Sequence, residues 1–202
     1  MNTEIVSSPN YWNDKYITNN TGWDIKSSNP VFIDLLTENK FIKPCNLLIT
    51  GSGKGYDAIA AAKKNYKVTA VDFSEKATEI AKKMAEENSV KVNFLQKDIF
   101  NLSSEYKNCF DAVYDYTIYC AINPGRRKEY ANVISEIIKP GGKLIALLFP
   151  VDGQPGGPPF NIDILEFYKL FSKYFQMEFS TFNINSIKSR KGKEVLQIYK
   201  KK

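Results

Sequence analysis

Three glycines at alternate positions, Gly51, Gly53 and Gly55, follow an apolar run in the stretch NLLITGSGKGYDA. Glycines at the end of a strand let the backbone turn sharply into a helix and let a ligand approach the main chain. A Walker loop would place Ser or Thr after the lysine, and a dinucleotide fingerprint would place its third glycine where Tyr56 stands. Asp57 would repel a pyrophosphate but suits an ammonium or sulfonium group. The turn therefore predicts a nucleotide-like ligand with a positive charge, or else a plain strand-to-helix connection.

Two further carboxylates stand where later strands of the same predicted sheet end. Asp72 closes the run VTAVD, the place where an acid accepts hydrogen bonds from both ribose hydroxyls, as it also does in NAD enzymes. Asp98 ends FLQKD beside Ile99 and Phe100, which predicts an acceptor for an adenine amino group next to apolar cover for the ring. Each acid alone is typical of a helix cap or a turn. Because the carboxyl ends of parallel strands meet at one crevice, Asp57, Asp72 and Asp98 together favour adenosine with an attached amino acid.

Aromatic side chains and one more strand end form a second group of candidates. Trp12 and Trp23 lie in an otherwise polar N-terminal segment, and we expect them to close over a flat, partly charged ligand or else to pin this segment to the core. The strand FDAVYDY ends at Asp115, placed to contact the ammonium of the ligand, and at Tyr116, placed to line an acceptor pocket. Phe160, in the loop GGPPF, is expected to roof that pocket or to lie in a simple connector.

Apolar runs that alternate with helical patterns predict the elements that hold these residues. The runs are CNLLIT, YKVTAVD, VKVNFL, FDAVYDY, KLIALLF, FQMEFSTFNI and EVLQIYK. The first five predict a parallel sheet with helices on both faces, and the last two predict an antiparallel pair that closes it. Helical spacing predicts an amphipathic helix over 74–88, capped by Ser74, and another helix near 161–174. We expect one α/β domain over 1–202, with an aromatic arm or lid at 1–24.

Composition disfavours several classes of function. The chain has 202 residues, of which 43% are hydrophobic, so one domain can bury a full core. Its net charge of +6 comes from lysines spread over most of the chain, which does not favour nucleic acid. With three cysteines and no histidine, neither a disulfide nor a metal site is expected, and Cys120 is interpreted as a small core or pocket residue. The chain shows no leader pattern and no apolar run of about 20 residues, so we expect a cytoplasmic protein without a membrane span.

Four stretches give the chain a resemblance to class I S-adenosylmethionine-dependent methyltransferases. They are YWNDKYITNNTGW, GSGKGYD, DYTIYCAINPGRR and GGPPF. The chain resembles the thiopurine methyltransferase superfamily nearly end to end, and within it the thiol and halide methyltransferase branch. It departs from the family pattern at Ser52 and Tyr56, where Cys and His are usual. The resemblance implies a Rossmann-like α/β fold with a seven-stranded, mostly parallel sheet and an antiparallel last strand pair. It also implies S-adenosylmethionine as the cofactor.

The residue types and the resemblance together give two sets of expected site residues. Those expected to bind the cofactor are Trp12, Tyr16, Trp23, Gly51, Gly53, Asp57, Asp72, Phe73, Asp98, Ile99 and Asp115. Those expected to surround the acceptor are Trp23, Tyr116, Tyr119, Arg127 and Phe160. Within the second set, Arg127 is implied by the resemblance alone, since it matches an arginine near the substrate and the cofactor.

The expected reaction is transfer of a methyl group to a small soft nucleophile: a thiol, a sulfide such as hydrogen sulfide or methanethiol, or a halide. A sulfonium methyl is already electrophilic, so a soft anion needs desolvation and in-line alignment but no general base. Asp115 and Tyr116 are the candidates if a base does act. The alternatives are a non-catalytic module that binds S-adenosylmethionine, and methylation of larger thiopurine-like or selenium or tellurium acceptors. The expected partner is a small molecule, with no nucleic acid and no membrane.

Overall fold

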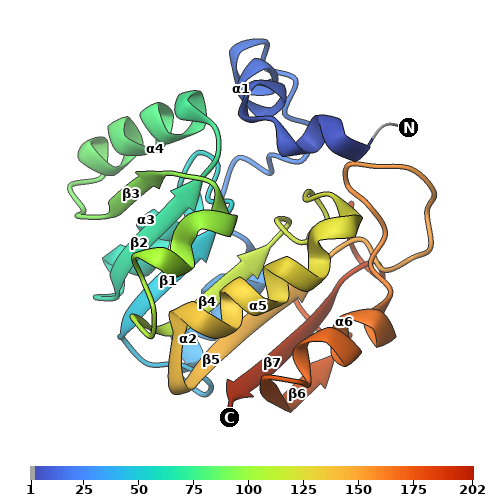
Figure 1. Cartoon of the computed structure of the whole chain (residues 1–202). Helices are drawn as coiled ribbons and strands as arrows, with labels where there is room; N and C mark the ends of the chain where they lie inside the picture. The colour runs from blue at the N-terminus through green and yellow to red at the C-terminus, as the bar shows by residue number, and fades with distance from the viewer. Residues whose placement is uncertain (1–2) are drawn as a thin grey trace.

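A seven-stranded sheet forms the centre of the computed structural model, which describes residues 3–202 (Figure 1). The strands are β1 (Asn46–Thr50), β2 (Lys67–Asp72), β3 (Asn93–Gln96), β4 (Phe110–Tyr116), β5 (Ile138–Leu148), β6 (Phe175–Thr181) and β7 (Val195–Lys201). Their order in the sheet is β3-β2-β1-β4-β5-β7-β6. Strands β1 to β5 run parallel, whereas β7 is antiparallel to both β5 and β6. The predicted parallel sheet and its antiparallel closing pair are confirmed.

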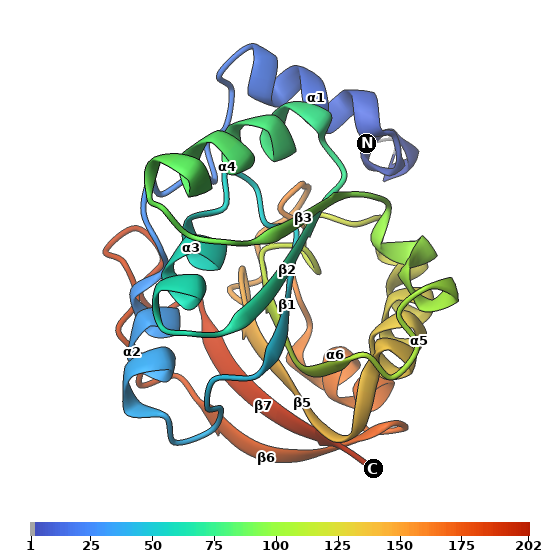
Figure 2. The same ribbon diagram turned by 90° about the vertical axis from the view of Figure 1, so that its left-hand side faces the viewer.

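Helices cover both faces of this sheet (Figure 2). One face carries α2 (Pro30–Glu38), α3 (Tyr56–Lys63) and α4 (Glu75–Glu87), and the other carries η2 (Ile99–Ser104), α5 (Arg127–Ile137) and α6 (Ile164–Phe171). Helix α4 matches the predicted amphipathic helix, because the Ser74 side chain accepts a hydrogen bond from the Ala77 amide at 3.1 Å and caps its first turn. Helix α6 starts later than predicted, because Asp163 caps it by accepting from the Leu165 amide at 2.8 Å.

Three short elements complete the chain outside the sheet layers. They are η1 (Thr3–Ser7), α1 (Pro9–Ile17) and η3 (Pro124–Arg126). The first two form the predicted arm, which lies above the carboxyl ends of the strands and contacts α4 (Figure 1). Within residues 3–202, no helix is both long enough and apolar enough to span a bilayer.

Two apolar clusters, one on each face of the sheet, hold the layers together. On the α5 and α6 face, Phe167 and Phe171 stack with ring centres 4.1 Å apart and are fully buried. On the α2 and α3 face, Phe32 stacks on Tyr114 of β4 at 4.0 Å. The central strands are therefore apolar on both sides, which is why they read as continuous apolar runs in the sequence.

The strand order places a crevice at the carboxyl ends of β1 and β4. Strand β1 lies between β2 and β4, so successive connections leave it in opposite directions across the sheet. In open parallel sheets, ligands bind at this reversal of strand order. The glycine turn, Asp72, Asp98 and Tyr116 all lie at or just beyond strand ends on this edge, so the fold brings these predicted residues to one place.

Candidate functional site

The glycine turn after β1 has the backbone conformation that the sequence predicts. Gly51 and Gly53 both have positive φ, at 57° and 53°, a region that favours glycine. A Cβ atom on Gly51 would lie 3.1 Å from the Ile118 side chain, and one on Gly53 would lie 3.0 Å from the Tyr16 hydroxyl. The positive φ therefore favours glycine at both positions, and a side chain there would also crowd Ile118 or Tyr16.

Asp72 lies at the end of β2 with both carboxylate oxygens fixed by main-chain amides. Oδ2 accepts from the Gly53 amide at 2.7 Å, and Oδ1 accepts from the Ser74 amide at 2.9 Å. Burial raises the pKa of this carboxyl, whereas these amide hydrogen bonds lower it. Because each carboxylate oxygen can accept more than one hydrogen bond, Asp72 keeps acceptor capacity for a pair of hydroxyls.

Asp98 has a corresponding arrangement beyond β3. Its Oδ1 accepts from the Phe100 amide at 3.0 Å and so caps η2, which turns Ile99 and Phe100 toward the crevice. The second oxygen, Oδ2, has an ion-pair contact with Arg126 at 4.0 Å. The carboxylate is therefore oriented by its neighbours and lies beside the apolar side chains that the sequence predicts as cover for a ring.

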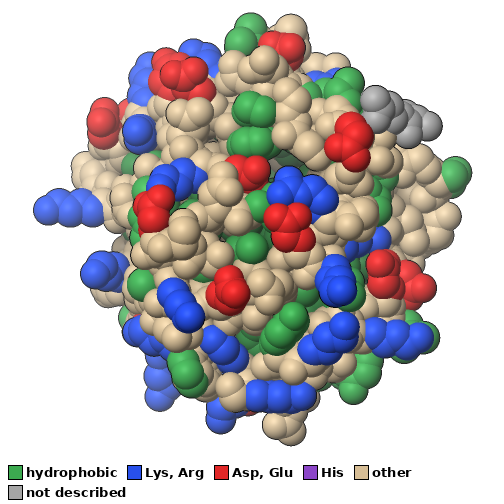
Figure 3. Space-filling view, viewed as in Figure 1, with side chains coloured by type: hydrophobic (Ala, Val, Ile, Leu, Met, Phe, Trp, Pro, Cys, Tyr) green, Lys and Arg blue, Asp and Glu red, His purple; other side chains and the backbone are tan. Residues whose placement is uncertain are grey.

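A cavity of about 320 Å³ lies at this edge of the sheet, beneath the arm. Eight of the predicted cofactor residues line it: Trp12, Tyr16, Trp23, Gly51, Asp72, Phe73, Asp98 and Ile99. Its other walls come from the segment after β4 and from the loops after β5 and β6. Figure 3 shows charged side chains of both signs around the hollow below the arm. A cavity of this size and mixed lining is typical of a small-molecule site.

A smaller cavity of about 90 Å³ adjoins the first and shares Tyr16, Trp23, Gly51 and Thr117 with it. Asp57 lines this smaller cavity, and its Oδ1 accepts from the Asn29 amide at 2.8 Å. Burial raises the pKa of Asp57 to about 7, because few groups there stabilise its charge. A buried carboxyl with so little support is suited to a cationic partner.

Aromatic packing holds the arm over the larger cavity. Trp12 and Tyr16 both meet Trp23 edge to face, with ring centres 5.5 and 5.9 Å apart. The Trp12 indole donates to the Val6 carbonyl at 2.8 Å, and Asn13 accepts from the Lys76 amide at 2.9 Å. The tryptophans pack within the arm and line the cavity, and the contact that ties this part of the arm to the domain is made by Asn13. Their closure over a ligand stays a prediction.

Four of the predicted residues line neither cavity. Asp115 is buried under α5, where Oδ2 accepts from the Tyr130 hydroxyl at 2.9 Å and burial raises its pKa to about 7. Tyr119 lies in the apolar core, with the Arg127 guanidinium carbon 4.7 Å from its ring centre, and the buried Arg127 donates to Glu166 at 3.1 Å and to the Asn161 carbonyl at 2.9 Å. Phe160 is also buried, and the cavity wall at its loop is formed by the preceding prolines. Their direct contact with a ligand stays a prediction.

Arg190, which sequence reasoning missed, lines the larger cavity from the loop after β6. It is only 5% exposed, donates to the Tyr116 hydroxyl and to the Trp23 carbonyl, and lies 4.4 Å from the Phe149 ring centre. Tyr116 in turn donates to Glu194 at 3.0 Å, and burial raises the pKa of its phenol well above the usual value. The sequence shows Arg190 only as one member of a basic run, and nothing local marks it as buried.

The described residues offer no metal site beside these groups. Among residues 3–202, no three His, Cys, Asp or Glu side chains gather in a way that would hold a metal ion. The charged groups of the two cavities include the carboxylates of Asp72, Asp98 and Asp57, the cations Lys97 and Arg126 near Asp98, and the buried guanidinium of Arg190. This arrangement can hold a polar, partly cationic nucleoside next to a small anion.

Comparison with known proteins agrees with this geometry. Residues 7–201 match the family described as "Thiopurine S-methyltransferase (TPMT)". The chain is 34% identical to "Probable thiol methyltransferase 2" of Arabidopsis thaliana over 193 residues, which covers 94% of this chain and 84% of the relative. It is 30% identical to "Thiocyanate methyltransferase 1" of the same plant, covering 90% of this chain and 80% of the relative.

Solved structures share the fold at lower identity. One is the 1,6-didemethyltoxoflavin-N1-methyltransferase of Burkholderia thailandensis, solved with S-adenosylhomocysteine, with a TM-score of 0.77 and 19% identity over 96% of this chain and 86% of that one. Another is a TehB-like S-adenosylmethionine-dependent methyltransferase from Corynebacterium glutamicum, with a TM-score of 0.67 and 15% identity over 96% and 97%. The chain belongs to the thiopurine S-methyltransferase family of S-adenosylmethionine-dependent methyltransferases.

Proposed function

We propose that the protein transfers the methyl group of S-adenosylmethionine to a small, soft, anionic acceptor, such as a thiolate, hydrosulfide, thiocyanate or halide. The observation that carries the proposal is Arg190, a buried cation that faces the cavity from the side opposite Asp72 and Asp98. The atoms that accept hydrogen bonds directly from Arg190 are neutral oxygens, and the buried Glu194 carboxylate is linked to it through the Tyr116 hydroxyl. The guanidinium can therefore hold a further anion at the cavity wall. If the cofactor occupies the part of the cavity beside Asp72 and Asp98, the part beside Arg190 remains for the acceptor.

The residues of the two cavities fit this cofactor. Asp72 and Asp98 keep acceptor capacity for ribose hydroxyls and an adenine amino group, and Asp57 lies where an amino-acid ammonium would neutralise it. Gly51 lines both cavities, so a ligand at this turn would lie next to each of them. When bound, S-adenosylmethionine supplies a sulfonium methyl group that a nucleophile attacks directly.

The acceptor side of the site acts by desolvation and alignment. Phe149, Pro158 and Pro159 provide apolar walls that exclude water from a small anion, while Arg190 holds its charge. Removing water from a soft anion raises its reactivity, and fixing its position converts the reaction into an effectively intramolecular one. The Tyr116 phenol keeps its proton at neutral pH because burial raises its pKa, so it orients Arg190 rather than accepting a proton.

Turnover with a panel of acceptors tests the proposal. Purified protein is incubated with S-adenosylmethionine and hydrosulfide, methanethiol, thiocyanate, iodide, 6-mercaptopurine or a catechol, and both S-adenosylhomocysteine and the methylated product are measured. We expect turnover with one or more of the small anions and none with the catechol. Arg190→Met is expected to raise KM for the anion by about tenfold or more, whereas Lys188→Met, a neighbouring charge outside the cavity lining, is not.

Three results would contradict it. Turnover restricted to the oxygen acceptor would assign a different chemistry to the site. Preference for 6-mercaptopurine over all small anions would favour the larger-acceptor alternative. Tight binding of S-adenosylhomocysteine without turnover on any acceptor would favour the non-catalytic module.

A further inference from the structure

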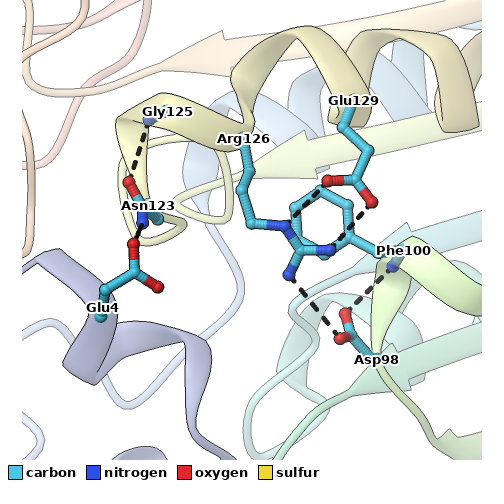
Figure 4. A network of polar contacts seen from close by, with 7 residues as sticks. All are labelled: Glu4, Asp98, Phe100, Asn123, Gly125, Arg126 and Glu129. Atoms are coloured by element: carbon cyan, nitrogen blue, oxygen red, sulfur yellow. Dashed lines mark hydrogen bonds and ion pairs between the residues drawn. The ribbon is translucent and has the colours of Figure 1, made fainter.

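Arg126, at the rim of the larger cavity, is held in place by three separate groups (Figure 4). Its Nε and Nη2 atoms donate to the two carboxylate oxygens of Glu129 at 2.8 and 2.9 Å. Its guanidinium carbon lies 3.5 Å above the centre of the Phe100 ring. The remaining nitrogen, Nη1, lies 4.0 Å from Oδ2 of Asp98. The guanidinium is thus a fixed donor beside the carboxylate that we predict to meet the adenine ring.

The turn that carries Arg126 is fixed as well. Asn123 Oδ1 accepts from the Gly125 amide at 2.9 Å, and Asn123 Nδ2 donates to Glu4 of the arm at 2.8 Å (Figure 4). Ordering a long arginine side chain costs conformational entropy, and a partly exposed ion pair with Glu129 returns little stability. Stability of the domain therefore does not account for this arrangement, whereas a preset donor at a ligand site does, because a ligand then loses less entropy on binding.

The chemistry of the pair formed by Asp98 and Arg126 matches one edge of adenine. Asp98 Oδ1 accepts from the Phe100 amide, so Oδ2, which lies 4.0 Å from the Nη1 donor, is the less occupied acceptor for a ligand. Adenine presents an amino donor directly beside a ring nitrogen that only accepts. Hypoxanthine, which carries an oxygen in place of the amino group, would set an acceptor against the carboxylate.

We propose that Arg126 is a specificity-determining residue of the cofactor site. Together with Asp98 it reads the amino edge of the adenine ring: Asp98 accepts from the amino group, and Arg126 donates to the neighbouring ring nitrogen, N1 or N7. Glu129 is the positioning residue that holds the guanidinium in this orientation. The proposal rests on S-adenosylmethionine as the cofactor and does not depend on which acceptor is methylated.

Binding of S-adenosylhomocysteine analogues by titration calorimetry tests this assignment without any turnover. The ligands are S-adenosylhomocysteine, its 1-deaza and 7-deaza forms, and S-inosylhomocysteine. The proteins are the wild type, Arg126→Met, Glu129→Gln and, as a matched control, Lys128→Met, which removes an exposed charge from the same helical turn. Thermal unfolding of each variant shows that it is folded before titration.

The wild type is expected to bind S-adenosylhomocysteine about tenfold more tightly than one of the two deaza forms, and more tightly than S-inosylhomocysteine. Arg126→Met should bind S-adenosylhomocysteine about tenfold more weakly than the wild type does, and no more tightly than it binds that deaza form. Through Asp98 it should still bind S-adenosylhomocysteine somewhat more tightly than S-inosylhomocysteine. Glu129→Gln should show the same trend with a smaller change, and Lys128→Met should match the wild type.

Equal binding of all three adenine forms by the wild type, or unchanged discrimination in Arg126→Met, would overturn the role of Arg126 while leaving the methyltransferase assignment intact. Absence of S-adenosylhomocysteine binding in the wild type would overturn both the role of Arg126 and the cofactor fit. If no acceptor of the panel is methylated but the wild type and Arg126→Met discriminate among these ligands as expected, only the proposed function would be contradicted.

Discussion

Replacing Asp57 by asparagine is expected to stabilise the protein at pH 8 and to weaken its binding of S-adenosylmethionine. Asp57 lines the smaller cavity and accepts from the Asn29 amide at 2.8 Å, a hydrogen bond that the asparagine carbonyl oxygen can also accept. The substitution therefore removes a poorly supported buried charge and keeps the local contact. A gain of stability with a loss of affinity is the combination expected of a charge retained for a ligand.

The magnitude follows from the pKa of this carboxyl. Burial raises it from an ordinary value of 3.8 to about 7, so the folded protein holds the proton over a pH range in which the unfolded chain has released it. The wild type consequently loses stability as pH rises from 4 to 7, at about 1.4 kcal/mol per pH unit from this group, with no further loss above 7. Full ionisation of Asp57 lowers the free energy of unfolding by about 4 kcal/mol if the group is fully shielded from solvent. Screening by solvent in the cavity brings the expected loss to about 2–4 kcal/mol.

Denaturant unfolding of Asp57→Asn and the wild type at pH 5, 6, 7 and 8 measures this difference. It should be smallest at pH 5, grow toward pH 7 and then level off. As a control of opposite sign, the pKa of Asp111 is lowered by its ion pair with Lys139 at 2.6 Å, so Asp111→Asn should lose stability above pH 4. A stability difference for Asp57→Asn that does not vary with pH would refute the reasoning, because the buried carboxyl would then carry no proton at neutral pH.

Four further expectations can be checked independently. Asp72→Ala should weaken the binding of S-adenosylhomocysteine, measured by calorimetry, by about 1–3 kcal/mol, since the ribose loses a charged hydrogen-bond acceptor. Unchanged affinity would place the ribose elsewhere. Thr117 is a β-branched residue with φ of 68° that lines both cavities. Thr117→Gly should raise the free energy of unfolding of the protein by about 0.5–1 kcal/mol, and a decrease would mean that the strain at Thr117 is already relieved. Deleting residues 1–24 should leave the circular dichroism of the sheet unchanged while abolishing turnover, and a fully active truncation would make the arm a mere surface attachment. For two thiols of different acidity, the rate should rise with pH to a plateau near each thiol's own pKa, whereas one inflection common to both, lost in Tyr116→Phe, would reveal a protein base.

The strands and the glycine turn could be predicted from the sequence because their patterns are local. A buried parallel strand is a short apolar run, and a turn with positive φ at Gly51 and Gly53 requires glycine. Asp72 and Asp98 follow directly once the strand ends are located, because parallel strands deliver their carboxyl ends to one edge. Helix α2 was missed although the sequence carries its signals: Asn29 followed by Pro30 is a helix-start pattern, and Val31, Phe32, Leu35 and Leu36 recur at helical spacing.

The remaining site residues depend on side-chain direction, which the sequence only partly encodes. Asp115 and Tyr116 are adjacent on β4, so their side chains point to opposite faces of the sheet and cannot both line one wall. Arg126 and Arg127 are adjacent at the start of a helix, where a rotation of about 100° per residue sends one to the cavity rim and the other into the core. Arg190 approaches from a loop, and no periodic pattern predicts where such a side chain ends.

The contacts of the arm connect the two halves of the site. Asp24 of the arm pairs with Lys54 of the glycine turn at 2.8 Å, beside the smaller cavity, while Arg190 on the acceptor side donates to the Trp23 carbonyl at 2.7 Å. A ligand that draws the Arg190 guanidinium toward itself would therefore act on the arm segment that we predict to close over the cofactor. Because Trp12 packs on Trp23 at the cavity wall, movement of this segment changes how well water is excluded from both ligands. Under the proposed function, the acceptor and the cofactor are therefore coupled through Arg190, Trp23 and Trp12, and each ligand is expected to raise the affinity for the other by the same factor.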